Sequence, residues 1–334
     1  MNLFRTKTAL RALGLSATSM AAAVSLFAAG VQDAQAAPEK AVVYQAFQSV
    51  QYLPLYVAID KGLFEKNGLD VQKVTAGSGA AGVAAVIGGH ADFSLQDPMT
   101  AVLANLKGAS LVGVANVVAG VPVWILVPKD STLKTEADLA GKSVATGLNP
   151  TTSTYLLQRL IKEKNIQNVS LNMVQLGTEL APVQAGRSVA ATMYEPQVDQ
   201  GIAAGFKILY GFPKAYPGGY DFSAINTLQS TITSKPKMVA AFVKGIAEAE
   251  ALIQSSPETA MAVAEKEFPG LTKEVVDNAV KRLIDNKIYA VNPVVPEEAF
   301  NNALSLQIDV GNIKPGAVTF ATQVNNTFAQ AALK

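Results

Sequence analysis

The chain of 334 residues is nearly neutral, with 27 lysines and arginines against 26 aspartates and glutamates. This even charge argues against a protein that binds nucleic acid or an anionic membrane, because the contact surfaces of such proteins are basic. The sequence has no cysteine and one histidine, His90. Disulfides are therefore excluded, and zinc sites and Ser-His-Asp triads are disfavoured.

The first 36 residues have the layout of a secretory signal peptide. Basic residues occur among the first 11 positions, residues 13–31 are apolar and uncharged, and Ala34-Gln35-Ala36 matches an A-x-A cleavage site. A transmembrane anchor is the alternative, although the run is rich in alanine and serine and only just long enough to span a bilayer. We expect cleavage after Ala36, which leaves 298 residues with a net charge of −1. No cysteine follows that could carry a lipid, so we expect a free protein in the periplasm.

Strand-like and helix-like runs alternate through the first half of the remaining chain. Runs rich in valine, isoleucine and aromatic residues predict strands at 40–47, 69–74, 91–95, 111–117 and 123–127. Helical spacing of apolar residues predicts helices at 54–62, 83–87 and 99–106. Such alternation predicts an α/β fold with a mostly parallel sheet, in which ligands bind beyond the carboxyl ends of the strands.

The pattern restarts in the second half and then becomes helical. The strand-like runs are 138–146, 172–175, 190–193, 207–210 and 222–228, with a helix at about 154–164 and an aromatic loop at 213–221. Long amphipathic helices are predicted at 236–255, 257–268, 272–285 and 296–311. We expect these helices to cover the first sheet.

A glycine-rich junction, Thr75–Gly82, joins a predicted strand to a predicted helix. Backbone N–H groups at such a helix start can hold an anion or a polar group. Gly77-x-Gly79-x-x-Gly82, with Asp97 about twenty residues further on, also matches a dinucleotide fingerprint, so an exported oxidoreductase is the alternative function. A strand and a helix precede the junction, however, whereas the fingerprint normally opens the first βαβ unit. A second polar junction, Gly147–Ser153, occupies the corresponding place in the second half.

Several ordered motifs resemble a known family. They are Tyr56–Phe64 (YVAIDKGLF), Gly68–Val71 (GLDV), Gly89–Phe93 (GHADF), Asp138-Leu139-x-Gly141-Lys142, Tyr194-Glu195-Pro196 and Leu306-Gln307-x-x-x-Gly311. Together they resemble the periplasmic solute-binding proteins of ABC importers in the nitrate, sulfonate, taurine and thiamine-pyrimidine group. The resemblance runs from about residue 40 to the end of the chain.

The resemblance implies a type II periplasmic-binding-protein fold, with two α/β lobes joined by two crossing strands. Lobe I would comprise 37–121 and 229–334, and lobe II 122–228. It also implies a binding protein rather than an enzyme, with no cofactor and no metal. The expected partners are a small-molecule ligand and ABC transporter permease subunits at the inner membrane, with no nucleic acid. We expect a monomer.

The ends of the predicted strands supply candidate ligand-binding residues, because a cleft between the lobes would lie there. They are Gln48, Tyr52, Gly77, Ser78, Gly79, Gln96, Asp97, Asn149, Thr151, Thr152, Ser153, Tyr194 and Glu195.

Each type of candidate also has a structural alternative. Ser78 and Ser153 could cap helices, with or without touching a ligand, and Asp97 before a proline could shape a turn. Glu195 could pair with a backbone N–H or a cation. The tyrosines could pack in the core, as aromatic side chains usually do.

The candidates favour a small organic ligand over nitrate. An oxyanion site would use arginine, which binds oxyanions with two parallel hydrogen bonds. The arginines after the signal peptide, Arg159, Arg187 and Arg282, lie in no predicted cleft loop. Asp97 and Glu195 would repel an anion but suit an amine or a ring N–H, so a zwitterion or a pyrimidine-like ring is expected.

Other enzyme patterns are incomplete. Ser131-x-x-Lys134 and Ser234-x-x-Lys237 match Ser-x-x-Lys, but the accompanying Ser-Asp-Asn and Lys-Thr-Gly motifs are missing from the sequence. A pyrimidine-synthase-like enzyme from the wider superfamily would need histidine and cysteine chemistry that this chain does not offer.

Overall fold

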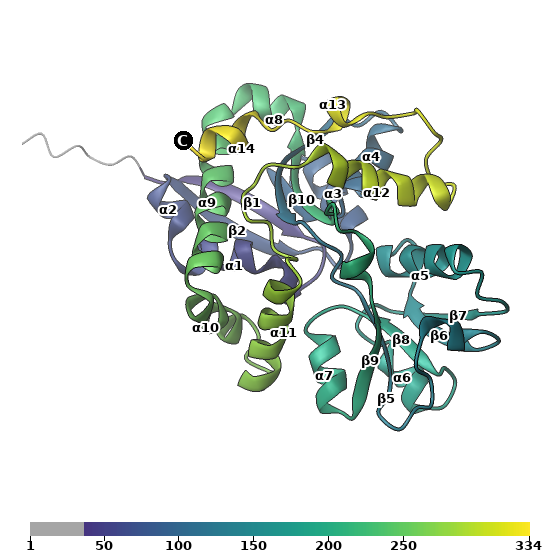
Figure 1. Ribbon diagram of the computed structural model, residues 1–334. Helices are drawn as coiled ribbons and strands as arrows, with labels where there is room; N and C mark the ends of the chain where they lie inside the picture. Colours follow the sequence, from purple (N-terminus) through teal and green to yellow (C-terminus); the bar gives the residue numbers. More distant parts are fainter. Residues whose placement is uncertain (1–36) are drawn as a thin grey trace, which may run out of the picture. The chain divides into compact units, whose positions relative to one another are not determined.

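The computed structural model describes residues 37–334, and the predicted signal peptide, residues 1–36, lies outside the described residues. Two five-stranded sheets organise the described chain (Figure 1). Each sheet is flanked by helices, which confirms the predicted α/β class. No helix within residues 37–334 has the length and apolar character needed to cross a membrane.

The first sheet has the strand order β2-β1-β3-β10-β4. Its strands are β1 (Glu39–Gln45), β2 (Leu69–Thr75), β3 (Phe93–Gln96), β4 (Leu111–Val118) and β10 (Ser223–Leu228). β1 pairs in parallel with β2 and β3, whereas β10 runs antiparallel to both β3 and β4. Four strands therefore point the same way, and their carboxyl ends lie at one edge of the sheet.

The second sheet repeats this plan with the order β7-β6-β8-β5-β9. Its strands are β5 (Trp124–Pro128), β6 (Ser143–Gly147), β7 (Ser170–Val174), β8 (Ala190–Met193) and β9 (Phe206–Gly211). β6 pairs in parallel with β7 and β8, and β5 runs antiparallel to β8 and β9. The chain thus passes from the first sheet to the second between β4 and β5, and returns between β9 and β10.

Helices of the described residues surround the two sheets up to β10 and immediately after it. The α-helices are α1 (Leu53–Asp60), α2 (Leu63–Lys66), α3 (Gly79–Ile87), α4 (Pro98–Asn105), α5 (Thr152–Glu163), α6 (Leu180–Gln184), α7 (Gln197–Ala203) and α8 (Gln229–Ser234), and the long α9 (Pro236–Ser255) follows. Short 3-10 helices are η1 (Val50–Tyr52), η2 (Glu136–Leu139) and η3 (Phe212–Ala215), the last overlapping the start of the predicted aromatic loop.

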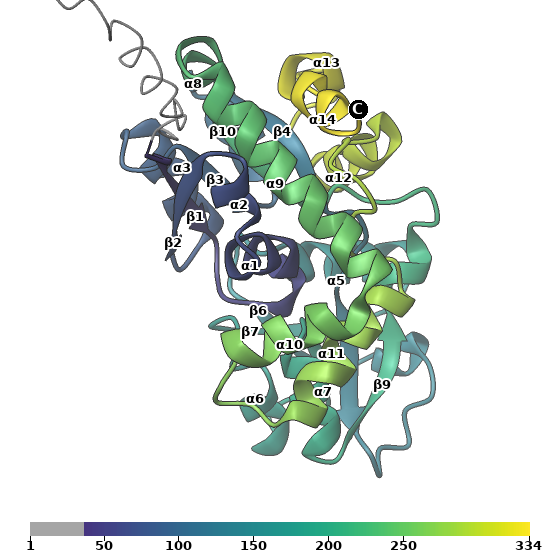
Figure 2. The same cartoon turned by 90° about the vertical axis from the view of Figure 1, so that its left-hand side faces the viewer.

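The chain ends in further helices, as the sequence predicts. They are α10 (Pro257–Glu267), α11 (Lys273–Asp285), α12 (Glu297–Asp309), α13 (Phe320–Gln323) and α14 (Thr327–Ala332). α9 packs against α1, α2 and α14, and Figure 2 shows it as a long helix leading from α8 towards α10. The expectation that the terminal helices cover the first sheet is incomplete, because α11 also contacts α7 and α12 contacts α5.

Two predicted helix starts are wrong, one by four residues and one by two. α3 begins at Gly79 rather than at residue 83, because Ser78 caps it: the Ser78 side chain accepts a hydrogen bond from the Ala81 N–H. α5 begins at Thr152 rather than at residue 154. Residues expected in a turn, Gly79 to Gly82 and Ser153, therefore lie inside helices.

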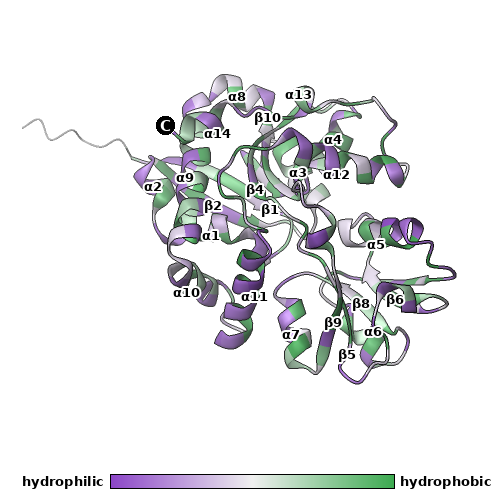
Figure 3. Ribbon diagram, viewed as in Figure 1, coloured by the Kyte–Doolittle hydropathy of each residue, from purple (hydrophilic) through white to green (hydrophobic). Residues whose placement is uncertain are grey.

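The core consists of the strands and the inward faces of the helices. Figure 3 shows the strands as mainly hydrophobic, while the outward faces of α10 and α11 are hydrophilic. A stack of phenylalanines joins α2, α9 and β3: the Phe64 and Phe242 ring centroids are 4.7 Å apart, and those of Phe93 and Phe242 are 4.1 Å apart. Such stacking fixes helix α9 over the first sheet.

Candidate functional site

A cavity of about 430 Å³ opens beyond the carboxyl ends of β1 and β3. It receives residues from both α/β halves: the α3 and α4 region on one side, and the start of α5 with Tyr194 on the other. Nine of the thirteen predicted residues line it, namely Tyr52, Gly77, Ser78, Gly79, Gln96, Asp97, Thr151, Thr152 and Tyr194.

A second cavity of about 470 Å³ adjoins the first, since Phe47, Ser78, Thr151 and Tyr194 line both. It adds two more predicted residues, Gln48 and Asn149, to the lining. The Gln48 side-chain amide is already occupied, because it donates hydrogen bonds to the backbone and side chain of Glu267. We name the first cavity the main cavity and the second the side cavity.

The glycine-rich junction forms one wall of the main cavity. Gly77 has φ +85°, a left-handed conformation that favours glycine. A Cβ on Gly79 would lie 3.3 Å from the Gln96 Cβ, and one on Gly82 would lie 3.6 Å from the Tyr44 carbonyl oxygen. A turn and close helix–sheet packing thus account for all three glycines. The junction also follows β2, an edge strand, whereas a dinucleotide fingerprint follows a central strand.

Asp97 links the two sides of the main cavity. One carboxylate oxygen, Oδ1, accepts a hydrogen bond from the Met99 N–H at 2.8 Å and so caps α4. The other, Oδ2, accepts from the Thr152 hydroxyl at 2.6 Å, across from the second half of the molecule. Burial raises the pKa of Asp97 to about 6, although both hydrogen bonds act to lower it. Asp97 therefore shapes the start of α4, as its structural alternative predicts, and also lines the main cavity.

Gln96 brings unpaired polar atoms to the cavity lining. Both amide atoms of Gln96 are buried and have no hydrogen-bond partner within residues 37–334. Buried polar groups are normally paired, and leaving one unpaired costs on the order of 1–3 kcal/mol. The Gln96 side chain is thus available to a polar ligand, whereas the Ser223 hydroxyl lies next to the Tyr52 hydroxyl and acts to lower its pKa.

Aromatic side chains form the floor where the two cavities meet. The Phe47 ring lies 5.5 Å from that of Tyr52 and 5.8 Å from that of Tyr194, measured between centroids. The Tyr194 hydroxyl accepts a hydrogen bond from the Ser153 N–H at 3.0 Å. Tyr52 and Tyr194 therefore pack in the interior and also line the cavity. Ser153 is buried and lines neither cavity, and the residue that precedes α5 is Thr151.

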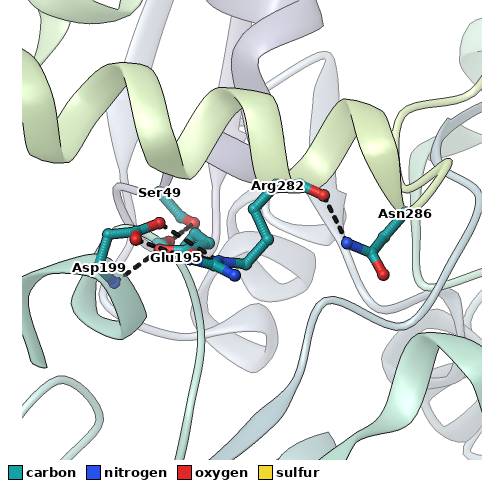
Figure 4. A network of polar contacts seen from close by, with 5 residues as sticks. All are labelled: Ser49, Glu195, Asp199, Arg282 and Asn286. Carbon is teal, nitrogen blue, oxygen red and sulfur yellow. Dashed lines mark hydrogen bonds and ion pairs between the residues drawn. The ribbon is translucent and has the colours of Figure 1, made fainter. Parts of the chain in front are cut away.

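Glu195 lies away from both cavities, in a buried ion-pair network (Figure 4). Arg282 Nε is 2.7 Å from Glu195 Oε1, and Arg282 Nη2 is 2.7 Å from Asp199 Oδ1. Burial and the adjacent Asp199 carboxylate raise the pKa of Glu195, while Arg282 acts to lower it. The Ser49 hydroxyl donates to the Glu195 carbonyl oxygen at 2.6 Å. These contacts match the alternative in which Glu195 pairs with a cation.

Several lining residues escaped the sequence prediction. Thr100, Leu103, Ala104 and Lys107 line the main cavity from α4 and the turn after it. Their spacing (i, i+3, i+4, i+7) is that of one helix face, so the stripe could have been recognised once α4 was placed at the cavity. Gln307 comes from α12, about two hundred residues further along the chain. Nothing in its local sequence indicates that position.

Solved structures of similar fold include two binding proteins and one enzyme. The alkanesulfonate-binding protein SsuA from Xanthomonas axonopodis pv. citri is 18% identical, with a TM-score of 0.70 over 87% of this chain and 99% of its own. The nitrate-binding protein NrtA from Synechocystis PCC 6803 is 16% identical, with a TM-score of 0.70 over 88% of each chain. The desulfurization enzyme DSZB is 12% identical, with a TM-score of 0.68 over 89% of this chain and 99% of its own.

These similarities confirm the predicted fold, and the family follows from a sequence comparison. Residues 49–260 match the model of the family described as NMT1/THI5 like. The matched segment comprises more than half of the chain and includes most of the residues that line the main cavity. The chain therefore belongs to the NMT1/THI5-like family.

Proposed function

We propose that this protein is the solute-binding component of an ABC importer. It captures a small organic molecule between two lobes and delivers it to permease subunits at the inner membrane. Membership of the NMT1/THI5-like family and the likeness to two solved binding proteins support this proposal. In this proposal lobe I comprises 37–121 and 229–334, lobe II comprises 122–228, and the protein acts as a periplasmic monomer after cleavage behind Ala36.

The observation that carries the proposal is a single cavity lined by strand-end residues of both sheets. Asp97 follows β3 of the first sheet, and Thr152 begins α5, the helix that follows β6 of the second sheet after a short loop. The hydrogen bond between their side chains shows that the two halves can approach at this point. Because the chain passes between the sheets through two connections, hinge motion would open and close the cavity around a ligand.

Binding without turnover is the favoured reading, although DSZB shares the fold. The chain has no cysteine, and its one histidine, His90, lies outside the lining of both described cavities. The lining of these cavities therefore holds neither a cysteine nor a histidine to act as nucleophile or base, and its hydrogen-bonding and apolar groups suit binding. A sulfonate, taurine-like or pyrimidine-like molecule, or another small polar organic solute, would suit such groups.

Native mass spectrometry of gently purified protein tests the proposal, followed by release and identification of any bound mass. A thermal-shift panel of sulfonates, taurine, nitrate, pyrimidines and amines complements it. A ligand at one hundred times its dissociation constant stabilises the protein by about 2.7 kcal/mol, which should raise Tm by about 4 °C for a chain of this size. Chemical conversion of a bound compound would refute the proposal. Saturable quenching of NADH fluorescence would instead support the oxidoreductase alternative.

A further inference from the structure

Two helices present matching stripes to the main cavity, and the residues in them are small or apolar except for Lys107 at one end. From α3 the lining residues are Ala80, Val83, Ala84 and Ile87, and from α4 and its C-terminal turn they are Thr100, Leu103, Ala104 and Lys107. Both sets follow the i, i+3, i+4, i+7 spacing of one helix face. α3 and α4 contact each other, so the stripes form the two walls of a groove.

The groove runs from a buried polar inner end, along apolar walls, to an exposed outer end. Gln96 and Asp97 lie at the inner end, directly before α4. Ile87, which is 48% exposed, and Lys107 lie at the outer end. At 1.5 Å of rise per residue, the seven steps from Thr100 to Lys107 give this wall a length of about 10 Å.

The charges of the groove are separated. Among the described residues that line the main cavity, Asp97 is the one acidic side chain and Lys107 the one basic side chain. A compact anion would meet the Asp97 carboxylate at the inner end and apolar walls beyond it. Asp97 Oδ2, which can accept a further hydrogen bond beside that from Thr152, and the unpaired amide oxygen of Gln96 instead suit a group that donates hydrogen bonds.

We infer that the ligand is an amphiphile whose amine or ring N–H head group binds Asp97 and Gln96 and whose apolar body lies in the groove between α3 and α4. This inference rests on the proposed function and narrows its ligand class. The aliphatic stem of Lys107 covers the outer end of the groove while its ammonium group stays in water.

A homologous series of n-alkylamines from ethylamine to hexylamine tests the inference, with binding measured by isothermal titration calorimetry. Each methylene that enters the groove should lower Kd about fourfold, because burying a CH₂ contributes about 0.8 kcal/mol. n-Alkanesulfonates of the same lengths serve as the anionic counterpart. Asp97→Asn, which can still cap α4, should weaken hexylamine binding at least tenfold, whereas Asp70→Asn on the exposed part of β2 should leave it unchanged.

Two alanines of α3 provide a matched pair of variants. Ala84 lines the groove and Ala81 does not, and both are exposed on the same helix. Ala84→Gln should abolish the dependence of Kd on chain length, whereas Ala81→Gln should preserve it. Circular dichroism and urea unfolding check that both variants fold.

Three results would overturn the inference: a Kd that does not change with amine length, equal effects of the two alanine variants, or sulfonates that bind more tightly than amines and ignore Asp97→Asn. If sulfonates bind in this way, the proposed function stands and only the ligand class fails. If neither series binds, no compound of the wider panel shifts Tm and no molecule co-purifies, the proposed function fails as well.

Discussion

Arg282 is the cation of a buried network, and its removal gives the sharpest test of the packing between α11 and the second half of the molecule. The side chains of Glu195 and Asp199 are 0% and 3% exposed. Arg282→Met would keep much of the apolar stem but leave both carboxylates without a cation. Breaking a buried ion pair in this way typically costs about 3–5 kcal/mol. We therefore expect a loss of this size in the free energy of unfolding at pH 7.5, measured by urea denaturation.

The loss should depend on pH. Burial and Asp199 raise the pKa of Glu195, and Arg282 opposes them, so the variant should have a still higher Glu195 pKa. A carboxyl whose pKa is raised in the folded state keeps its proton there after the unfolded chain has lost its own. The free energy of unfolding therefore falls as pH rises from the ordinary glutamate pKa to the raised pKa. The difference between variant and wild type should therefore shrink at pH 4.5.

Arg159→Met is the matched control, because Arg159 pairs with the more exposed Glu163 and Asp309. Exposed pairs contribute about 0–1 kcal/mol, so this variant should lose little stability. The reasoning would be refuted if both variants lost the same stability, or if the Arg282→Met loss were equal at pH 4.5 and pH 7.5.

Three other substitutions test separate features of the fold and the site. Gly245→Ala should cost about 1–3 kcal/mol by urea denaturation, since its Cβ would lie 2.5 Å from Phe64 Cδ1; Gly270→Ala, where no atom lies within 4 Å, should cost almost nothing and is its control. Asp221 is buried, and its pKa is raised to about 8 by burial and by nearby Asp97. Asp221→Asn should therefore gain stability over wild type as pH rises from 5 to 7, by about 3 kcal/mol over this interval, and an equal gain at both pH values would contradict the burial argument. Thr152→Val removes a hydrogen bond that lowers the pKa of Asp97, so the Asp97 carboxyl should titrate above its present value of about 6 in ¹³C NMR; an unchanged midpoint would exclude that hydrogen bond.

The strands and much of the main cavity could be predicted from sequence because both depend on local signals. Apolar runs bounded by glycine and proline marked the strands, and ligands of parallel sheets bind at strand ends. That rule alone selected Gln96 and Asp97 after β3 and Thr152 after β6. Gly77 could be predicted because glycine allows a tight turn between a strand and a helix, and in the structure it has a left-handed φ.

The other features of the site could not be predicted from local sequence. They depend on which way a helix turns its side chains, or on partners that are distant in sequence. A two-residue error in the start of α5 was enough to place Ser153 in the cavity, whereas in the helix its side chain turns inward. The role of Glu195 depends on Arg282, which lies 87 positions away and carries no local signal of that pairing. To predict that Lys107 lines the main cavity, one would need to know where α4 lies and which of its faces points to the cavity.

The place of β10 in the first sheet determines the order in which the two sheets can assemble while the chain is being synthesised. β5 to β9 occupy 124–211 without interruption, so the second sheet can assemble as soon as that segment is available. β3 and β4 pair with β10 on either side rather than with each other. Until residue 228 has been made, β4 is therefore separated from β2-β1-β3, and both pieces expose an unpaired edge. Because unpaired edges invite aggregation, a chain that stalls between residues 118 and 228 should be the form most dependent on chaperones.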